Sequence, residues 1–88
     1  MDSVEKQLRD ALKAERRTLP ASADLLVEAY VSQVKRMRDA ASRVDEEGLV
    51  VAGPKDQPVP HPAITIEKQA AAEVARLRKQ IVEASRRT

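Results

Sequence analysis

The chain has 88 residues, enough for one small domain, and 16 Lys+Arg against 14 Asp+Glu give a formal net charge of +2. It has no Cys and a single His, His61, which excludes disulfides, thiolate zinc sites and His-pair metal sites within one chain. With only two Gly, the chain has no glycine-rich phosphate loop. From these absences together we predict no metal, no cofactor and no enzymatic activity. No apolar run approaches the roughly 20 residues that span a bilayer, and residues 1–10 hold no signal-peptide core. We therefore expect an intracellular protein with no membrane partner.

Large apolar side chains are scarce in this sequence. Hydrophobic residues make up 42% of the chain, but 14 of them are Ala. Chains below roughly 70–80 residues rarely stabilise themselves on one core without disulfides, metals or partners. This chain is only slightly longer and has no disulfide, so we predict a homo-oligomer.

The first helical segment covers residues 3–17. Asp2 and Glu5 have the spacing of a capping box. Pro20 disfavours helix at the residue before it, so we expect the helix to end near Thr18. Apolar residues at helical intervals form one narrow stripe: Val4, Leu8, Ala11 and Leu12.

The second segment is predicted as one helix of about 25 residues within residues 21–48. Ser22 is a good N-cap, Asp24 favours the first turn, and Gly48 favours the end of the helix. The apolar positions between them have the spacing of a coiled-coil seam: Val27, Tyr30, Val34, Met37, Ala41 and Val44.

The third segment runs from Pro62, which fits a first helical turn, to about Arg86. One apolar seam consists of Ala70, Val74, Leu77, Ile81 and Ala84. A second stripe lies on another side of the helix: Ile64, Ala71, Ala75 and Val82. A helix that is apolar on two sides needs two partners. We predict that the second helix packs antiparallel against the seam and that a neighbouring subunit packs on the second stripe.

Residues 49–61, LVVAGPKDQPVPH, connect the two long helices. The apolar start favours extended structure, residues 53–56 form a turn signal, and Pro58 and Pro60 permit only a partial ladder. We predict a short β-hairpin-like finger at the tip of the helical hairpin. It caps the hairpin locally, packs on a neighbouring subunit through Val51 and Val59, or presents Val50 and Val59 to a different protein. Because these apolar residues stand on an otherwise charged chain, we favour an interface over a local cap.

Together these segments predict an all-α single domain, residues 1–88. Its parts are a short N-terminal helix (1–20), a long helix (21–48), an extended Pro-rich finger (49–61) and a second long helix (62–88). The two long helices form an antiparallel hairpin.

Two groups of basic residues are candidates for contact with DNA. The first follows the N-terminal helix and consists of Lys6, Arg9, Lys13, Arg16 and Arg17. The second lies near the C-terminus and includes Arg76, Lys79, Arg86 and Arg87. Neutralising phosphates releases counterions, which favours such binding. The alternatives are a solvated helix face for the first group and stabilisation of the helix dipole for the second. With Tyr30 as the only aromatic residue, base stacking is disfavoured, and binding should depend strongly on salt.

Other reactive residue types favour structural interpretations. His61 stands between two prolines at a helix start, where its ring can cap backbone N–H groups. Asp45, Glu46 and Glu47 are consecutive, so on a helix they face different directions and do not form one metal site. We interpret them as a solvent-exposed acidic segment, with contact to a basic partner surface as the alternative.

Four stretches taken in order resemble a family of phage terminase small subunits. They are LLVEAY at 25–30, DEEGLVVAGP at 45–54, PVPHPA at 58–63, and Ile66-Glu67 with Ala70. The resemblance implies a ring-forming, non-catalytic subunit of the DNA-packaging motor in the cytoplasm of a bacterial host. Such a subunit engages double-stranded viral DNA and docks the large terminase subunit, an ATPase–nuclease. The alternative is a coiled-coil assembly adaptor without DNA binding.

Overall fold

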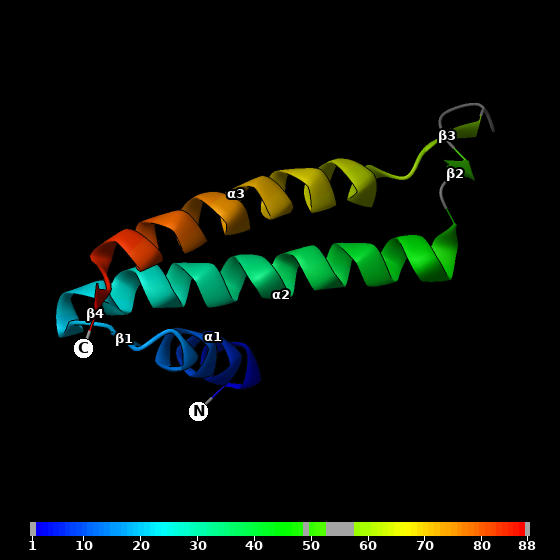
Figure 1. Ribbon diagram of the computed structural model, residues 1–88. Helices are drawn as coiled ribbons and strands as arrows, with labels where there is room; N and C mark the ends of the chain where they lie inside the picture. Colours follow the sequence, from blue (N-terminus) through cyan, green and yellow to red (C-terminus); the bar gives the residue numbers. More distant parts are fainter. Residues whose placement is uncertain (1, 49, 53–57, 88) are drawn as a thin grey trace.

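The computed structural model describes residues 2–48, 50–52 and 58–87, without the side chains of residues 51 and 52. Helix α1 (Ser3–Ala14) precedes a long antiparallel hairpin of α2 (Asp24–Glu47) and α3 (Pro62–Ala84) (Figure 1). The molecule is a rod of 58 × 19 × 18 Å. Helix α1 lies beside the first half of α2, and both chain termini are at that end of the rod (Figure 1). The predicted helical hairpin with a preceding short helix is confirmed.

Helix α1 is capped and amphipathic, as its sequence predicts. The Asp2 carboxylate accepts a hydrogen bond from the Val4 backbone N–H at 2.9 Å. Val4, Leu8 and Leu12 are buried, which places one face of α1 on the hairpin. The helix ends at Ala14, earlier than the predicted end near Thr18, because residues 17–18 leave the helix to pair with the chain's C-terminal segment.

The start of α2 differs from the prediction. Ala21–Ala23 form a short 3-10 turn, η1, and Ser22 lies inside it. The cap position of α2 is Ala23, which offers no side-chain hydrogen bond, so the predicted Ser22 cap is wrong. At the other end Gly48 has φ 87°, and its N–H donates to the Val44 carbonyl at 2.8 Å. This positive φ explains why Gly follows the helix.

Helices α2 and α3 run side by side, with small residues at their contact (Figure 1). Ala40, Ala63 and Ala70 are buried between them. Ala side chains let two helix backbones approach closely, so this part of the core is thin. Ala40 is buried more deeply than Ala41, the residue predicted for the seam, because the contact between the helices drifts from a strict coiled-coil register.

The larger apolar side chains gather at the end of the rod that α1 covers. Leu8 and Leu12 from α1, Val27 from α2 and Ile81 from α3 form one buried cluster. Ile81 is fully buried, and Tyr30 packs at the edge of the cluster as predicted. Burying each such aliphatic side chain contributes about 1.5–3 kcal/mol. Most of the hydrophobic stabilisation is therefore at this end.

Two short antiparallel strand pairs close the two ends of the rod. At the tip, β2 (Val50–Ala52) pairs with β3 (Pro58–Pro60), with Val51 opposite Val59, which confirms the predicted hairpin. At the other end, β1 (Arg17–Thr18) pairs with β4 (Arg86–Arg87). This second pair was not predicted. It joins two segments almost 70 residues apart, and α3 ends at Ala84 to permit it, slightly before the predicted end.

Candidate nucleic-acid interface

The N-terminal basic residues divide between α1 and the segment after it. Lys6 and Lys13 are exposed on the side of α1 away from its buried face, whereas Arg9 is half-buried at the flank, near the start of α2. Arg16 was predicted to continue the helical stripe, but it follows the helix end and has φ 57°. Arg17 lies in β1. The continuous stripe predicted over residues 6–16 is therefore interrupted after Lys13.

Arg9 is largely engaged by carboxylates of its own chain. Its Nε and Nη2 donate to Glu5 Oε1 at 3.2 and 3.1 Å, one helical turn earlier. Asp24 Oδ1 lies 3.9 Å from the same Nη2. A half-exposed pair of this kind contributes well under 1 kcal/mol to stability. The two carboxylates also reduce the positive potential at Arg9, which makes this side chain a weaker site for phosphate.

Arg17 joins the two ends of the chain. Its Nη1 donates to the Ser85 hydroxyl oxygen at 3.0 Å and to the Val82 carbonyl at 3.4 Å. The Ser85 hydroxyl in turn donates to the Val82 carbonyl at 2.6 Å. The guanidinium thus donates to one carbonyl and one hydroxyl at the C-terminal end of α3, while β1 pairs with β4 beside it. Only 19% of the Arg17 side chain is exposed.

The strand pair brings the two predicted basic groups together. Figure 1 shows β1 and β4 at one end of the rod, near the start of α2. We call this region the cationic end and define it by Lys13, Arg16, Arg17, Arg86 and Arg87. Glu15, whose Oε2 lies 3.7 Å from Arg17 Nε, is the one carboxylate within residues 13–18 and 85–87.

A hollow of about 340 Å³ lies within this end of the molecule. Three cationic side chains, one hydroxyl and two leucines line it: Arg9, Lys13, Arg17, Thr18, Leu12 and Leu19. Cationic groups and a hydroxyl over an apolar floor suit a phosphate group that rests on a protein surface.

The remaining C-terminal candidates are placed differently. Arg76 donates to Glu73 at 2.6 and 3.3 Å on the exposed side of α3. The hydrogen bond lowers the pKa of the Glu73 carboxyl and raises that of Arg76. Lys79 is exposed on the same helix. The structure therefore places Arg76 and Lys79 along the rod, whereas Arg86 and Arg87 are at the cationic end.

The tip of the rod carries the opposite charge. Asp45, Glu46 and Glu47 end α2 and are exposed, and we call them the acidic tip. Glu47 reaches across to α3, where its Oε2 contacts His61 Nε2. His61 is 93% buried, and its Nδ1 accepts a hydrogen bond from the Ala63 N–H at 2.9 Å. The predicted capping role of His61 is confirmed, and its contact with Glu47 is a link that the sequence pattern did not reveal.

The predicted subunit-contact residues have unequal exposure. Ala71 and Ala75 are exposed on α3, and Ile64 is half-buried. Val82 packs on the chain's own core cluster, beside α1. At the tip Val59 is half-buried, and the side chain of Val51 lies outside the described part of the structure.

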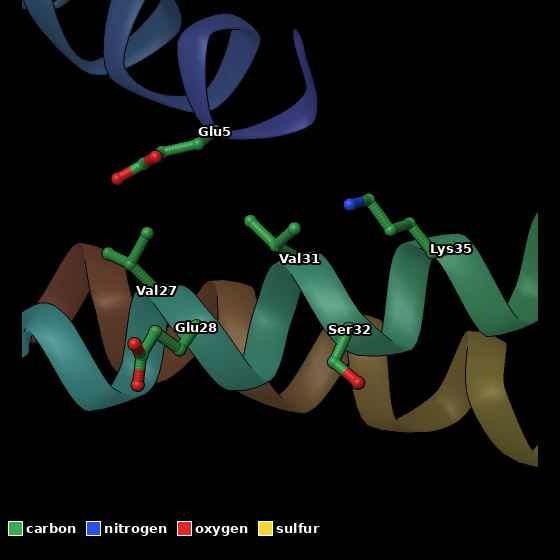
Figure 2. A pocket seen from close by; sticks show the side chains of 6 residues that line it. All are labelled: Glu5, Val27, Glu28, Val31, Ser32 and Lys35. Carbon is green, nitrogen blue, oxygen red and sulfur yellow. The ribbon is translucent and has the colours of Figure 1, made fainter. Parts of the chain in front are cut away.

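A second hollow of about 490 Å³ separates α1 from α2. Figure 2 shows Val27 and Val31 pointing from α2 toward α1, with Glu5 extending from α1 above them. Glu28, Ser32 and Lys35 complete the lining, and Lys35 Nζ lies 2.6 Å from Asp2 Oδ2. Two carboxylates beside one already paired lysine disfavour phosphate, so this hollow is not part of the candidate nucleic-acid interface.

Comparison with protein-family models matches residues 6–82 to the phage terminase small subunit. The chain belongs to this family. The search of curated proteins and the search of solved structures found no match.

The family match includes the helices but not the last residues of the cationic end. It begins inside α1 at Lys6, includes α2 and most of α3, and ends at Val82, before Arg86 and Arg87. For a terminase small subunit, membership in this family indicates a role in phage genome packaging. Members of the family are generally non-catalytic. The predicted family resemblance is thus confirmed.

Within the described ranges, no three His, Asp or Glu side chains are grouped so that they could hold a metal ion. None of the helices in the described part of the chain has the length and apolar composition needed to cross a bilayer.

Proposed function

We propose that this chain is the DNA-recognition subunit of a phage packaging motor. It assembles into a homo-oligomeric ring, binds double-stranded viral DNA and docks the large terminase subunit, while performing no catalysis itself. The family match over residues 6–82 is the observation that carries this proposal.

The charge distribution supports binding to DNA through phosphates. The formal net charge of +2 is small, but a ring repeats every cationic group once per subunit. The basic residues that we propose to build the DNA interface are Lys6, Arg9, Lys13, Arg16, Arg17, Arg76, Lys79, Arg86 and Arg87. Because the chain has a single aromatic residue, its affinity should come from counterion release and fall steeply with salt.

The slender shape supports assembly. A rod 19 Å by 18 Å in cross-section buries few large side chains, and Ala71 and Ala75 leave a small-residue face exposed on α3. The proposed subunit contacts are Ile64, Ala71, Ala75 and Val82 along α3, with Val51 and Val59 at the tip. A heterologous contact of this kind closes into a ring when the rotation between subunits permits.

The tip supports docking of the large subunit. Val50 is 57% exposed there, next to the acidic tip. An exposed apolar side chain beside carboxylates suits a partner surface with an apolar pocket and a basic rim.

Native mass spectrometry combined with a duplex-DNA shift tests the proposal. We expect one closed species of many chains that binds duplex DNA in low salt and releases it as salt rises. Ala75→Glu should break the assembly, whereas Ser42→Glu, which adds the same charge to an exposed site on α2, should leave it intact. A monomer would contradict the ring, and an assembly without affinity for DNA would favour the adaptor alternative.

A further inference from the structure

The cationic end is assembled from the two extremes of the chain. Pairing of Arg17 with Arg87 and of Thr18 with Arg86 places three basic side chains, next to Arg16, where α1 and α3 end. In the sequence these residues belong to two separate groups. Any ligand that binds both groups at once requires the strand pair to be formed.

Arg17 differs from the other cations of this end in its contacts. Its Nη1 donates to the Val82 carbonyl and the Ser85 hydroxyl, and its Nε faces Glu15. With 19% of its side chain exposed, it is less accessible than the paired arginines Arg9 and Arg76. Its hydrogen-bonding capacity is used to hold α3 rather than to face solvent.

Lys13 is in the opposite situation. It lines the hollow of the cationic end, and no described hydrogen bond or ion pair engages its ε-amine. Thr18, from the strand that pairs with β4, lines the same hollow. A free ammonium group and a hydroxyl on neighbouring elements are common donors to phosphate oxygens.

We infer that the cationic end is a composite phosphate-binding site for duplex DNA, in which Arg17 is a positioning residue. Lys13, Arg86 and Arg87 contact phosphates, and Arg17 holds the two chain ends in the register that brings them together. The inference rests on the proposed DNA-binding function and names the part of the chain that performs it.

Fluorescence anisotropy of a labelled duplex with the full chain, measured over a series of salt concentrations, tests the phosphate contacts. Lys13→Gln should lower affinity about tenfold in low salt and reduce the slope of log affinity against log salt by about 1 per engaged subunit. The matched control is Lys68→Gln, which removes the same charge from an exposed site on α3. It should change neither quantity by a comparable amount.

Arg17→Lys tests positioning, because it keeps the charge but replaces the forked guanidinium with a single ammonium group. We expect Arg17→Lys to lose affinity and salt slope nearly as much as Arg17→Gln. In a chain that already carries Arg86→Gln and Arg87→Gln, Arg17→Lys should have little further effect. If Arg17 contacts phosphate itself, Arg17→Lys will retain affinity, and its effect will add to that of the other two.

Amide hydrogen exchange separates failure of this inference from failure of the proposed function. Arg17→Lys should speed exchange at residues 82–87 whether or not the chain binds DNA, and unchanged exchange there would refute the positioning role. A wild-type chain that ignores duplex DNA would overturn the proposed function and the composite site together. If the wild type binds duplex DNA and Lys13→Gln and Lys68→Gln lose affinity equally, the composite site alone is overturned.

Discussion

The two ends of the rod are built in contrasting ways. At the tip, the paired positions of β2 and β3 are six to ten residues apart along the chain, and the acidic tip is a run of consecutive residues. At the cationic end, β1 and β4 join residues almost 70 positions apart, and the large apolar side chains of all three helices meet behind them. Local contacts thus organise the tip, and tertiary contacts organise the cationic end.

This contrast has a consequence for stability and for binding. Loss of a core side chain at the cationic end should lower the stability of the whole molecule, whereas a substitution at the tip should lower it only slightly. The charge follows the same division, with cations where the chain ends meet and carboxylates at the tip. In a ring with parallel subunits, all cationic ends lie on one rim, and phosphate contacts from several subunits add together.

The largest expected effect comes from Ile81→Ala, which empties a fully buried site at the cationic end. We expect the free energy of unfolding to fall by about 2–5 kcal/mol. Val50→Ala at the tip, where the side chain is 57% exposed, should change it by less than about 0.5 kcal/mol. Urea denaturation followed by circular dichroism measures both, and equal losses would refute the contrast between the ends.

Gly48→Ala tests the backbone at the tip. Among the described residues, the atom nearest to a Cβ at this position is the Val50 carbonyl oxygen at 4.0 Å, so the cost comes from φ of 87° and not from crowding. With ψ at 168°, this is a backbone region that essentially only Gly occupies, and an L side chain there costs about 1–3 kcal/mol. The control is Ala14→Ser, at an exposed position at the end of α1. The free energy of unfolding of Gly48→Ala should be lower than that of the control by this amount, and equal values would show that the turn relaxes freely.

His61→Ala removes both the cap of α3 and the contact with Glu47. We expect a loss of about 1 kcal/mol, the usual value of an N-cap side chain. His61→Asn restores a capping group but not the reach to Glu47, so it should recover most of that loss. If His61→Asn is as unstable as His61→Ala, the Glu47 contact dominates and the capping role is secondary.

The smallest effect concerns Asp2. The hydrogen bond from Lys35 and that from the Val4 N–H hold the pKa of the Asp2 carboxyl below its ordinary value of 3.8. Its stabilising contribution is therefore complete above pH 3.8 and is lost as pH falls through the lowered pKa. The difference in Tm between the wild type and Asp2→Asn should shrink as the pH falls below this value. A difference that grows under acid would contradict the assigned direction.

The sequence predicted the parts of the fold that depend on neighbouring residues. Helical periodicity located α2 and α3, Pro62 marked the start of α3, and Gly48 marked the end of α2. The hairpin at the tip followed from a Gly-Pro turn flanked by extended residues. His61 was recognised as a cap because its position between prolines limits it to a helix start.

The sequence could not predict contacts between distant segments. Strands β1 and β4 have two residues each, which is too few to show an alternation of apolar and polar side chains. Nothing local distinguishes Arg17 from Arg16, although Arg17 bonds to α3 and Arg16 adopts a positive φ. The early end of α1 has the same cause, since pairing with the C-terminal segment overrides the helical preference of residues 15–17.

Lysine acetylation, followed residue by residue by mass spectrometry with and without duplex DNA, tests most directly whether the cationic end meets the genome. Our account predicts that duplex DNA slows acetylation of Lys13 strongly and leaves that of Lys68 unchanged in the same sample. Equal protection at both residues, or protection of Lys68 while Lys13 stays reactive, would contradict it.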